Sequence, residues 1–247
     1  MSGLYLVVDL VVLAFPLLLS FDKRVHFFGQ WKDFWPVNIG LLVVFIIWDV
    51  FFTKWGIWGF NPDYLLGPEW LGLPIEEWLF FICIPYASVF TYATLKHYVR
   101  RNPFRHSAIT LNMAAIAITA GLSYWYSDAW YTFSASALLC VFFIWSAVNY
   151  VAWSHHLWIA FFVLLTPFII TNGVLTGITF WEYPLLHNDA GQIQDSIVWY
   201  AGEHTTGWRI FSMPVDDLIY GFLLLGLHIA GFEALQKRRL GLGPYSD

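Results

Sequence analysis

Residues 157–178 read LWIAFFVLLTPFIITNGVLTGI, a stretch that contains no charged side chain. An α-helix needs about 20 mostly apolar residues to cross a bilayer, and this stretch is long enough. The rest of the chain has the same character, because 59% of its 247 residues are hydrophobic and only 12% are charged. Soluble domains carry about 25% charged residues. The composition therefore predicts a membrane protein with several spans.

Seven apolar stretches are long enough, or nearly long enough, to cross a bilayer. They are residues 4–20, 37–53, 76–95, 107–124, 131–149, 157–178 and 215–236. The first is short, but it has no basic segment before it and no cleavage signature, so we expect a retained span and not a signal peptide. Open sheets cannot cross lipid, because their edge groups would stay unpaired. The expected fold class is all-α, a polytopic membrane bundle of about seven transmembrane helices.

Basic residues indicate the orientation, because cytoplasmic loops carry an excess of Lys and Arg. Of the 12 basic residues, ten follow the first, third and seventh spans, which all end on one side: Lys23, Arg24, Lys32, Lys96, Arg100, Arg101, Arg105, Lys237, Arg238 and Arg239. Only Lys54 and Arg209 fall on the other side. We expect a multi-pass protein of the cell inner membrane, with its N-terminus outside, its C-terminus in the cytoplasm and residues 179–213 outside.

Two motifs in the chain resemble each other. Residues 73–80 read LPIEEWLF, and residues 213–220 read MPVDDLIY. Each contains Pro, one aliphatic residue, two acids, two apolar residues and one aromatic residue, and each opens an expected span from outside. Acids after a proline are also an ordinary helix start, but capping alone does not account for the recurrence of the whole pattern.

The segments before the two motifs also match. Trp48-Asp49 and Thr171-Asn172 lie near the outer ends of the preceding spans, and residues 58–62 and 180–184 are aromatic stretches that end in Pro. We therefore expect two parallel three-helix repeats plus a connecting helix. The first repeat would occupy residues 1–106, and residues 107–247 would hold the connecting span and the second repeat.

Acidic and amide side chains of five expected spans share one depth, toward the outer side. They are Asp9, Asp49, Glu76, Glu77, Asn172, Asp216 and Asp217. A charged group at the bilayer centre costs at least about 2.5–3.5 kcal/mol, and such groups normally face the interior of a bundle. We expect one pocket that opens toward the outer half of the bilayer. Structural roles stay open for Asp49 and Asn172, and we favour one for Asp9.

Several function classes lack the residues that they require. The sequence has no Gly-rich dinucleotide or phosphate motif, no Lys in the seventh span for a retinal Schiff base, and no aspartate-rich motif for a magnesium–diphosphate clamp. Its histidines and its two cysteines, Cys83 and Cys140, show no metal-ligand spacing and no disulfide pattern. We expect no cofactor, no metal and, without a basic stripe, no nucleic-acid partner.

The remaining chemistry is that of a carboxylic acid in an aromatic pocket. A carboxyl group surrounded by hydrocarbon favours its protonated form and can act as a general acid. Protonation of an alkene gives a carbocation, which aromatic faces stabilise by about 0.5–2 kcal/mol each. The 15 Trp, 13 Tyr and 23 Phe residues supply such faces. This setting favours acid-initiated cyclisation of a lipophilic polyene that enters from the bilayer.

Residues 74–80 and 214–220 resemble the PxE[ED]xx[FY] signatures of the flavin-independent membrane lycopene cyclase family. In this family two small homologous subunits, or a fusion of them as in the related archaeal and fungal domains, form the enzyme. The resemblance covers nearly the whole chain. It implies a lycopene β-cyclase, an enzyme of carotenoid biosynthesis that converts the ψ ends of lycopene to β-ionone rings, giving γ- and then β-carotene without net redox change.

The resemblance implies that the essential acids are Glu76, Glu77, Asp216 and Asp217. Around them we expect substrate contacts from Asp49, Asn172, Trp48, Trp78, Phe80 and Tyr220. Adjacent helical residues point about 100° apart, so each pair is expected to supply one acid that faces the pocket and one that orients it; the sequence does not decide which. The family usually has Glu at position 216, so the second half is either less active or has a different role.

Two alternatives stay open. A related end-group enzyme, such as a hydratase of the same terminal alkene, would need the same acids. A proton-coupled transporter also suits acids at one depth in parallel repeats, although the inner halves of the spans carry almost no charge. The expected partners are lycopene and membrane lipids. The sequence leaves open a homo-oligomer, the number of lycopene ends that react, and the choice between β and ε rings.

Overall fold

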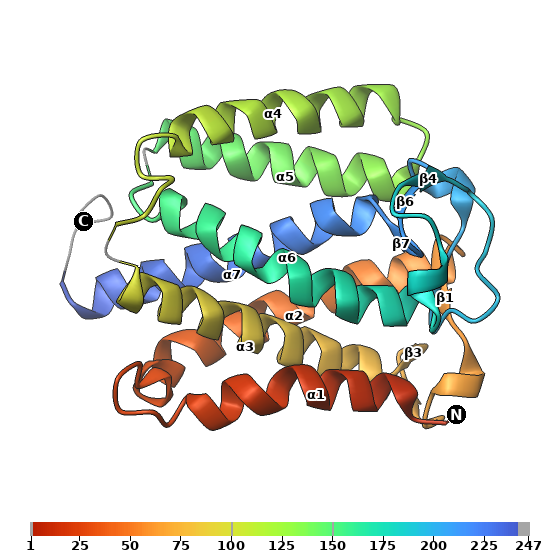
Figure 1. Ribbon diagram of the computed structural model, residues 1–247, viewed down its shortest axis with the longest axis horizontal. Helices are drawn as coiled ribbons and strands as arrows, with labels where there is room; N and C mark the ends of the chain where they lie inside the picture. Colours follow the sequence, from red (N-terminus) through yellow and green to blue (C-terminus); the bar gives the residue numbers. More distant parts are fainter. Residues whose placement is uncertain (1, 100, 150, 242–247) are drawn as a thin grey trace.

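The computed structural model describes residues 2–99, 101–149 and 151–241. Arg100, one of the basic residues counted above, is outside the described residues. In the described chain, seven helices lie side by side along one direction (Figure 1). Their bounds are α1 Leu4–Leu19, α2 Trp31–Lys54, α3 Ile75–Tyr98, α4 Ala108–Trp125, α5 Trp130–Val148, α6 Ser154–Thr176 and α7 Asp216–Arg239. The expected all-α bundle is confirmed.

Six of these helices are long and apolar enough to cross a membrane, within the residues that the structure describes. The remaining helix, α1, has 16 residues and is about 24 Å long at 1.5 Å per residue, somewhat less than the bilayer core of about 30 Å. Large apolar side chains such as Val11, Leu18 and Val148 are exposed on the outside of the bundle, where lipid would cover them. The protein is embedded in a membrane.

Helix α2 starts at Trp31, ahead of the expected start at residue 37. Its first turn contains a charged residue, Asp33, that hydropathy excludes from a span, but this residue has a partner inside the bundle. Asp33 binds Arg239 of α7 at 2.6 Å. Because this charge is paired within the protein, the helix extends beyond its apolar stretch.

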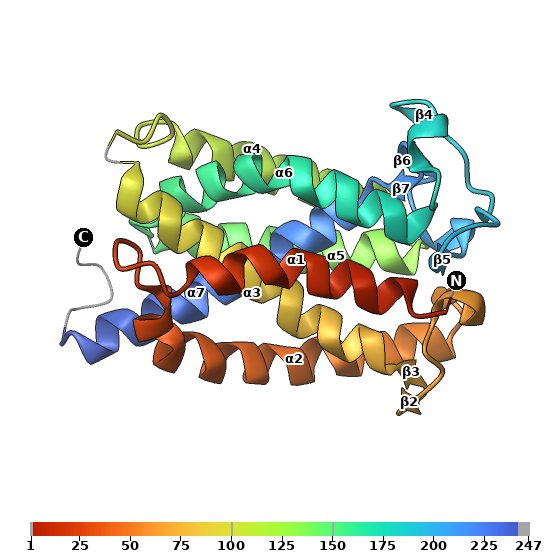
Figure 2. The ribbon, with the colours of Figure 1, turned by 60° about the horizontal axis from the view of Figure 1, so that its bottom comes forward.

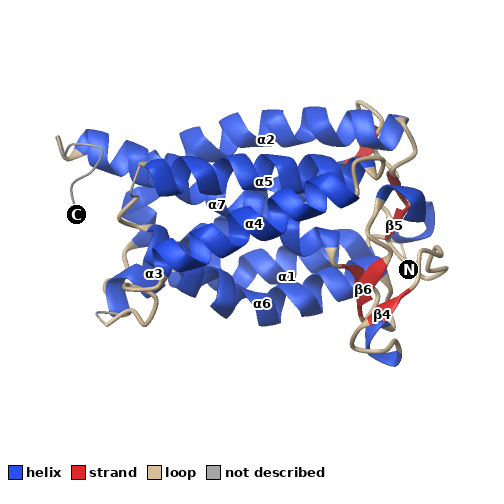
Figure 3. Cartoon of the chain, turned by 90° about the horizontal axis from the view of Figure 1, so that it is seen from above, coloured by secondary structure: helices blue, strands red, loops and turns tan. Residues whose placement is uncertain are grey.

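Short strands gather at one end of the bundle, the end at which α3 and α7 begin (Figure 3). The strands are β1 Trp58–Phe60, β2 Glu69–Trp70, β3 Leu73–Pro74, β4 His187–Asn188, β5 Val198–Tyr200, β6 Trp208–Ile210 and β7 Met213–Pro214. β2 and β3 form an antiparallel hairpin directly before α3, and β6 and β7 do the same before α7. β1 and β5 pair antiparallel with each other and so connect the two halves of the chain.

The two halves match residue by residue in the segments that lead into α3 and α7. An offset of 140 residues relates β1 at Trp58 to β5 at Val198. The same offset relates Leu71 (φ 57°) to Phe211 (φ 54°), each in the turn of its hairpin. Non-glycine residues rarely adopt this left-handed conformation. Its recurrence at equivalent positions therefore shows that the two hairpins share one turn geometry.

The helices are arranged with the same symmetry. α1 packs on α3 as α5 packs on α7, and α2 packs on α7 as α6 packs on α3. Figure 2 shows α1 lying along α3. α4 packs mainly against α5. Helices of each half therefore contact helices of the other half. The interface between the halves is formed by α3, α7 and the helices packed against them.

One expected correspondence between the halves is wrong. Residues 180–182 form a 3-10 turn, whereas the segment equivalent to residues 58–62 is 198–202, because β1 and β5 occupy equivalent places and pair with each other. Asp49 precedes β1 by nine positions, but Asn172 precedes β5 by 26 positions. The second half thus carries an insertion, and residues 180–184 lie within it.

Ion pairs occupy the end of the bundle opposite the strands. Lys96 of α3 pairs with the buried Glu233 of α7, which also accepts a hydrogen bond from Tyr92 at 2.6 Å. The pair between Asp33 and Arg239 lies at the same end. The last turns of α3 and α7 at this end carry basic side chains, whereas the first turns of the same helices at the strand end carry pairs of acids.

Candidate active site

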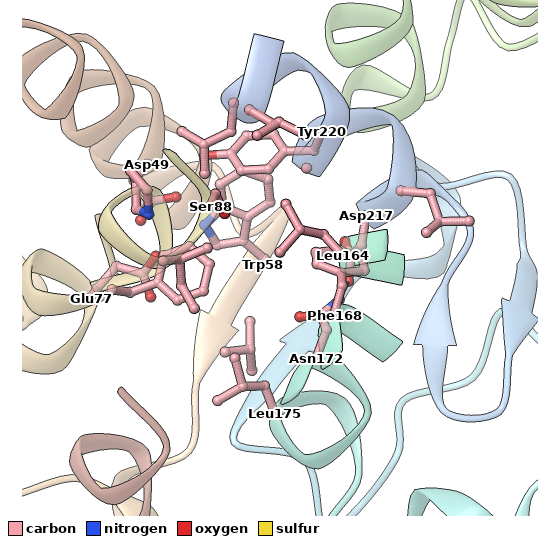
Figure 4. A pocket seen from close by; sticks show the side chains of 18 of the residues that line it. Asp49, Trp58, Glu77, Ser88, Leu164, Phe168, Asn172, Leu175, Asp217 and Tyr220 are labelled. Carbon is pink, nitrogen blue, oxygen red and sulfur yellow. The ribbon is translucent and has the colours of Figure 1, made fainter. Parts of the chain in front are cut away.

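A cavity of about 930 Å³, including the space at its mouth, lies between the two halves near the strand end. Its wall is mostly aromatic and aliphatic. Its polar side chains are few and come from both halves: Tyr5, Asp49, Glu77 and Ser88 from the first, and Tyr131, Asn172, Tyr200 and Asp217 from the second. Figure 4 shows Asp49 and Glu77 on one side and Asn172 and Asp217 on the other, with Trp58 and Tyr220 nearby.

Glu77 is the centre of the first polar group. It lies in the first turn of α3, and its Oε2 accepts a hydrogen bond of 2.5 Å from the hydroxyl of Tyr5 on α1. Asp49 on α2 lies beside Glu77 (Figure 4) and interacts with Glu77 and with Trp58. All four side chains are buried. Three helices and strand β1 thus converge on one buried pair of carboxyl groups.

Asp217 is the centre of the second polar group. Its Oδ1 accepts a 2.6 Å hydrogen bond from the hydroxyl of Tyr131 on α5. Its Oδ2 accepts from Nδ2 of Asn172 on α6 at 2.6 Å and from the hydroxyl of Tyr200 on β5 at 3.2 Å. Burial raises the pKa of the Tyr200 phenol well above its ordinary value, so this hydroxyl keeps its proton and donates. Asp217 therefore receives three hydrogen bonds and makes none with another acid.

The two groups are equivalent within the repeat. Each contains an acid in the first turn of α3 or α7, a tyrosine that is the second residue of α1 or α5, and a polar residue near the end of α2 or α6. Sequence reasoning missed the tyrosines. Each tyrosine is the second residue of its helix, as in Leu4-Tyr5 of the first helix and Trp130-Tyr131 of the fifth. This common position was the signal that could have found them.

The other acid of each pair has a different place. Glu76 Oε1 accepts a 2.6 Å hydrogen bond from the backbone N–H of Leu66, and Asp216 Oδ2 accepts from the N–H and the hydroxyl of Thr206 at 3.2 and 2.9 Å. Thr132 also donates to Asp216. Leu66 and Thr206 are again 140 residues apart. Both acids are buried but hold the segments before the hairpins, whereas Glu77 and Asp217 face the cavity.

The predicted aromatic contacts divide into two sets. Phe80 and Tyr220 line the cavity. Trp48 packs edge-on behind Tyr220, with ring centroids 5.3 Å apart, and Trp78 stacks on Trp70 of β2 at 4.3 Å, so the structure places neither indole in the cavity wall. Trp78 directly follows Glu77, and the helical rotation of about 100° per residue turns it toward the hairpin.

Further aromatic rings that sequence analysis did not single out complete the wall. Trp58, Phe60, Phe161, Phe168, Tyr131 and Tyr200 all line the cavity. Tyr131 and Tyr200 stack at 5.6 Å with nearly parallel planes, and Trp58 meets Tyr220 edge-on at 6.2 Å. Such faces can stabilise a cation. Among the described residues, no group of three or more His, Cys, Asp or Glu side chains could hold a metal ion.

The fold and the cavity define a class of protein: a membrane-embedded helical bundle whose two halves bring buried acids to one aromatic cavity. The family model described as "Lycopene cyclase" matches residues 2–95 and 128–235, which is most of the chain. The chain belongs to the lycopene cyclase family, as the resemblance of its motifs predicted. The first matched segment contains α1 to α3 and the second contains α5 to α7.

Two fungal proteins are among its relatives, both called "Bifunctional lycopene cyclase/phytoene synthase". The protein of Podospora anserina is 32% identical over 91 residues, which cover 35% of this chain and 13% of that protein. The protein of Neurospora crassa is 30% identical over 88 residues, covering 34% of this chain and 12% of that protein. The match thus spans only about an eighth of these relatives. No solved structure matches the chain significantly.

Proposed function

We propose that this protein is a lycopene β-cyclase of carotenoid biosynthesis. It would catalyse the acid-initiated cyclisation of the ψ end groups of lycopene to β-ionone rings, giving γ- and then β-carotene without net redox change. The observation that carries this proposal is the convergence of Glu77 and Asp217, from equivalent places in the two halves, on one aromatic cavity. Membership of the lycopene cyclase family supports lycopene as the substrate.

The reaction uses protein groups alone. A carboxylic acid gives its proton to the terminal double bond of the polyene, whose electron pair forms the new C–H bond and leaves a tertiary carbocation. The next double bond attacks this cation and forms the C–C bond that closes a six-membered ring. A carboxylate then removes a ring proton, and the electrons of that C–H bond form the ring double bond. The product is an isomer of the substrate.

The aromatic wall favours the cationic intermediates over the neutral substrate. Each favourable ring face contributes about 0.5–2 kcal/mol, and about 1.4 kcal/mol changes a rate tenfold. Trp58 and Tyr220 lie between the two acid groups in the cavity (Figure 4). Two such faces would together accelerate ring closure by about fivefold to about a thousandfold.

We further propose that the protein lies in the cell inner membrane with its N-terminus outside and its C-terminus in the cytoplasm. The basic side chains Lys96 and Arg239 lie at the end opposite the strands, as the excess of basic residues on the cytoplasmic side requires. Lycopene would enter the cavity from the bilayer. The two halves, residues 1–106 and 107–247, would act as one unit because each supplies part of the cavity.

Expression in lycopene-accumulating cells tests the function. The wild type should convert lycopene to β-ring carotenoids, identified by chromatography and mass. Glu77→Gln and Asp217→Asn should lose this conversion or change its product, whereas Glu182→Gln, at an exposed acid of the outer segment, should behave as wild type. Full β-carotene production by both cavity variants would contradict the proposal, and a hydroxylated acyclic product from the wild type would indicate a hydratase instead.

A further inference from the structure

The two polar groups of the cavity are equivalent in place but differ in the partners of their central acids. The partner of Glu77 is a second carboxyl group, Asp49, whereas the partner of Asp217 is an amide, Asn172. We propose, on the basis of the cyclase function above, that the halves divide the reaction between them. The Glu77–Asp49 pair delivers the proton to the polyene, and Asp217 removes the ring proton.

The first group must hold a proton. Two neighbouring carboxylates in a buried site are not both ionised in the resting state, because their charges repel, and such pairs share one proton. When that proton moves to the polyene, the carbocation formed beside the pair takes over its positive charge. Glu77 and Asp49 interact with each other at the cavity, and the two residues are 6% and 2% exposed. Tyr5 donates its own hydroxyl hydrogen to Glu77 Oε2. This hydrogen belongs to the tyrosine, so it does not replace the proton that the two carboxyl groups share. The pair therefore carries a transferable proton that faces the cavity.

The second group is arranged for the ionised acid. Asp217 accepts hydrogen bonds from Tyr131, Asn172 and Tyr200, and hydrogen bonds to a carboxylate favour its charged form. Asn172 has no acidic proton to share. Asp217 therefore gives up its proton more readily than the Glu77–Asp49 pair, and once ionised it presents the basic oxygens that the final step needs.

Both groups reach the same part of the cavity. Tyr220 lines the cavity and interacts electrostatically with Asp49, Glu77 and Asp217. Figure 4 shows the two groups on opposite sides of the space beside Trp58 and Tyr220. An end group bound there would receive its proton from one side and lose a ring proton to the other, while both negative charges stabilise the intervening cation.

The protons balance over one turnover. The pair loses the hydrogen that becomes a C–H hydrogen of the substrate, and Asp217 gains the hydrogen that leaves the ring. Afterwards Asp217 releases its proton to water and the pair takes one from water, which restores the starting state. The net change is the isomerisation of the polyene alone.

Four variants of the full-length protein, reconstituted in lipid vesicles that contain lycopene, test this division. Loss of a general acid or base typically costs 10²–10⁴-fold in rate, so Glu77→Gln should leave lycopene unreacted, with at least about a hundredfold slower consumption. Asp217→Asn should still consume lycopene, but its cation should lose another proton or take up water, giving a shifted ring double bond or a cyclic alcohol. Asp128→Asn and Glu182→Gln, at exposed acids, are the matched controls.

The partner residues give the second pair of variants. Asp49→Asn makes the first group resemble the second, so it should stop protonation as Glu77→Gln does. Asn172→Asp makes the second group resemble the first, so Asp217 would share a proton and the products should shift as in Asp217→Asn. Infrared difference spectra should show the carbonyl stretch of a protonated carboxyl group lost in Asp49→Asn and Glu77→Gln and retained in Asp217→Asn.

The opposite pattern would overturn the division. If Asp217→Asn leaves lycopene unreacted and abolishes the infrared band, while Glu77→Gln yields a shifted ring, then the roles are reversed. If both variants give the same residual mixture of products, the halves are not specialised. These outcomes differ from failure of the cyclase function itself, in which the wild type would leave lycopene unchanged.

Discussion

Glu76 and Glu77 are adjacent, chemically identical and both buried, yet the structure gives them different tasks. Glu76 Oε1 accepts the backbone N–H of Leu66 at 2.6 Å. Glu76→Gln keeps an oxygen for this N–H, so the charged hydrogen bond, worth about 1.5–3 kcal/mol, becomes a neutral one of about 0.5–1.5 kcal/mol. We expect a loss of about 1 kcal/mol in the free energy of unfolding, and cyclisation within about threefold of wild type.

The same substitution at Glu77 should affect mainly the activity, not the stability. Glu77→Gln should reduce cyclisation by about 10²–10⁴-fold. Glu76→Ala, which leaves the N–H of Leu66 without an acceptor, should destabilise the protein by about 1–3 kcal/mol. Lycopene consumption in vesicles at matched protein amounts gives the activities, and thermal unfolding in detergent gives the stabilities. If Glu76→Gln were as inactive as Glu77→Gln while unfolding at the wild-type temperature, the assignment of the cavity-facing acid would be wrong.

Three further changes test other parts of the site. Tyr131→Phe keeps the stacked ring but removes the hydrogen bond to Asp217, worth about 1.5–3 kcal/mol; turnover should fall by about 10–100-fold in the vesicle assay, and an unchanged rate would mean that the hydroxyl does not orient the acid. Trp58→Leu removes one cation-stabilising face, so turnover should fall by about 2–30-fold, whereas unaltered kinetics would exclude that role. Gly202→Ala would place a Cβ against the backbone carbonyl oxygen of Ala190, so thermal unfolding should show a loss of about 1–3 kcal/mol; a wild-type unfolding temperature would show that this loop yields freely.

The sequence alone determined the membrane bundle, its helices and the family. Lipid leaves no water to pair with backbone groups, so each span must satisfy its own hydrogen bonds, and a run of apolar residues is sufficient to locate it. The repeated motifs before α3 and α7 were equally local signals. The error at residues 180–184 arose because similar composition was used for a correspondence that depends on strand pairing. The earlier start of α2 was missed because the partner of Asp33 lies on α7.

Only the tertiary structure decided how the acids are used. Glu76 and Glu77 cannot be told apart by type or spacing, since the direction in which each points depends on how α3 packs against α1, α2 and the hairpin before it. The contact of Tyr5 with Glu77 joins residues 72 positions apart, and that of Tyr131 with Asp217 joins residues 86 positions apart. Helix formation in lipid depends on residues within a few turns of one another, whereas a cavity between two halves depends on residues from many segments at once.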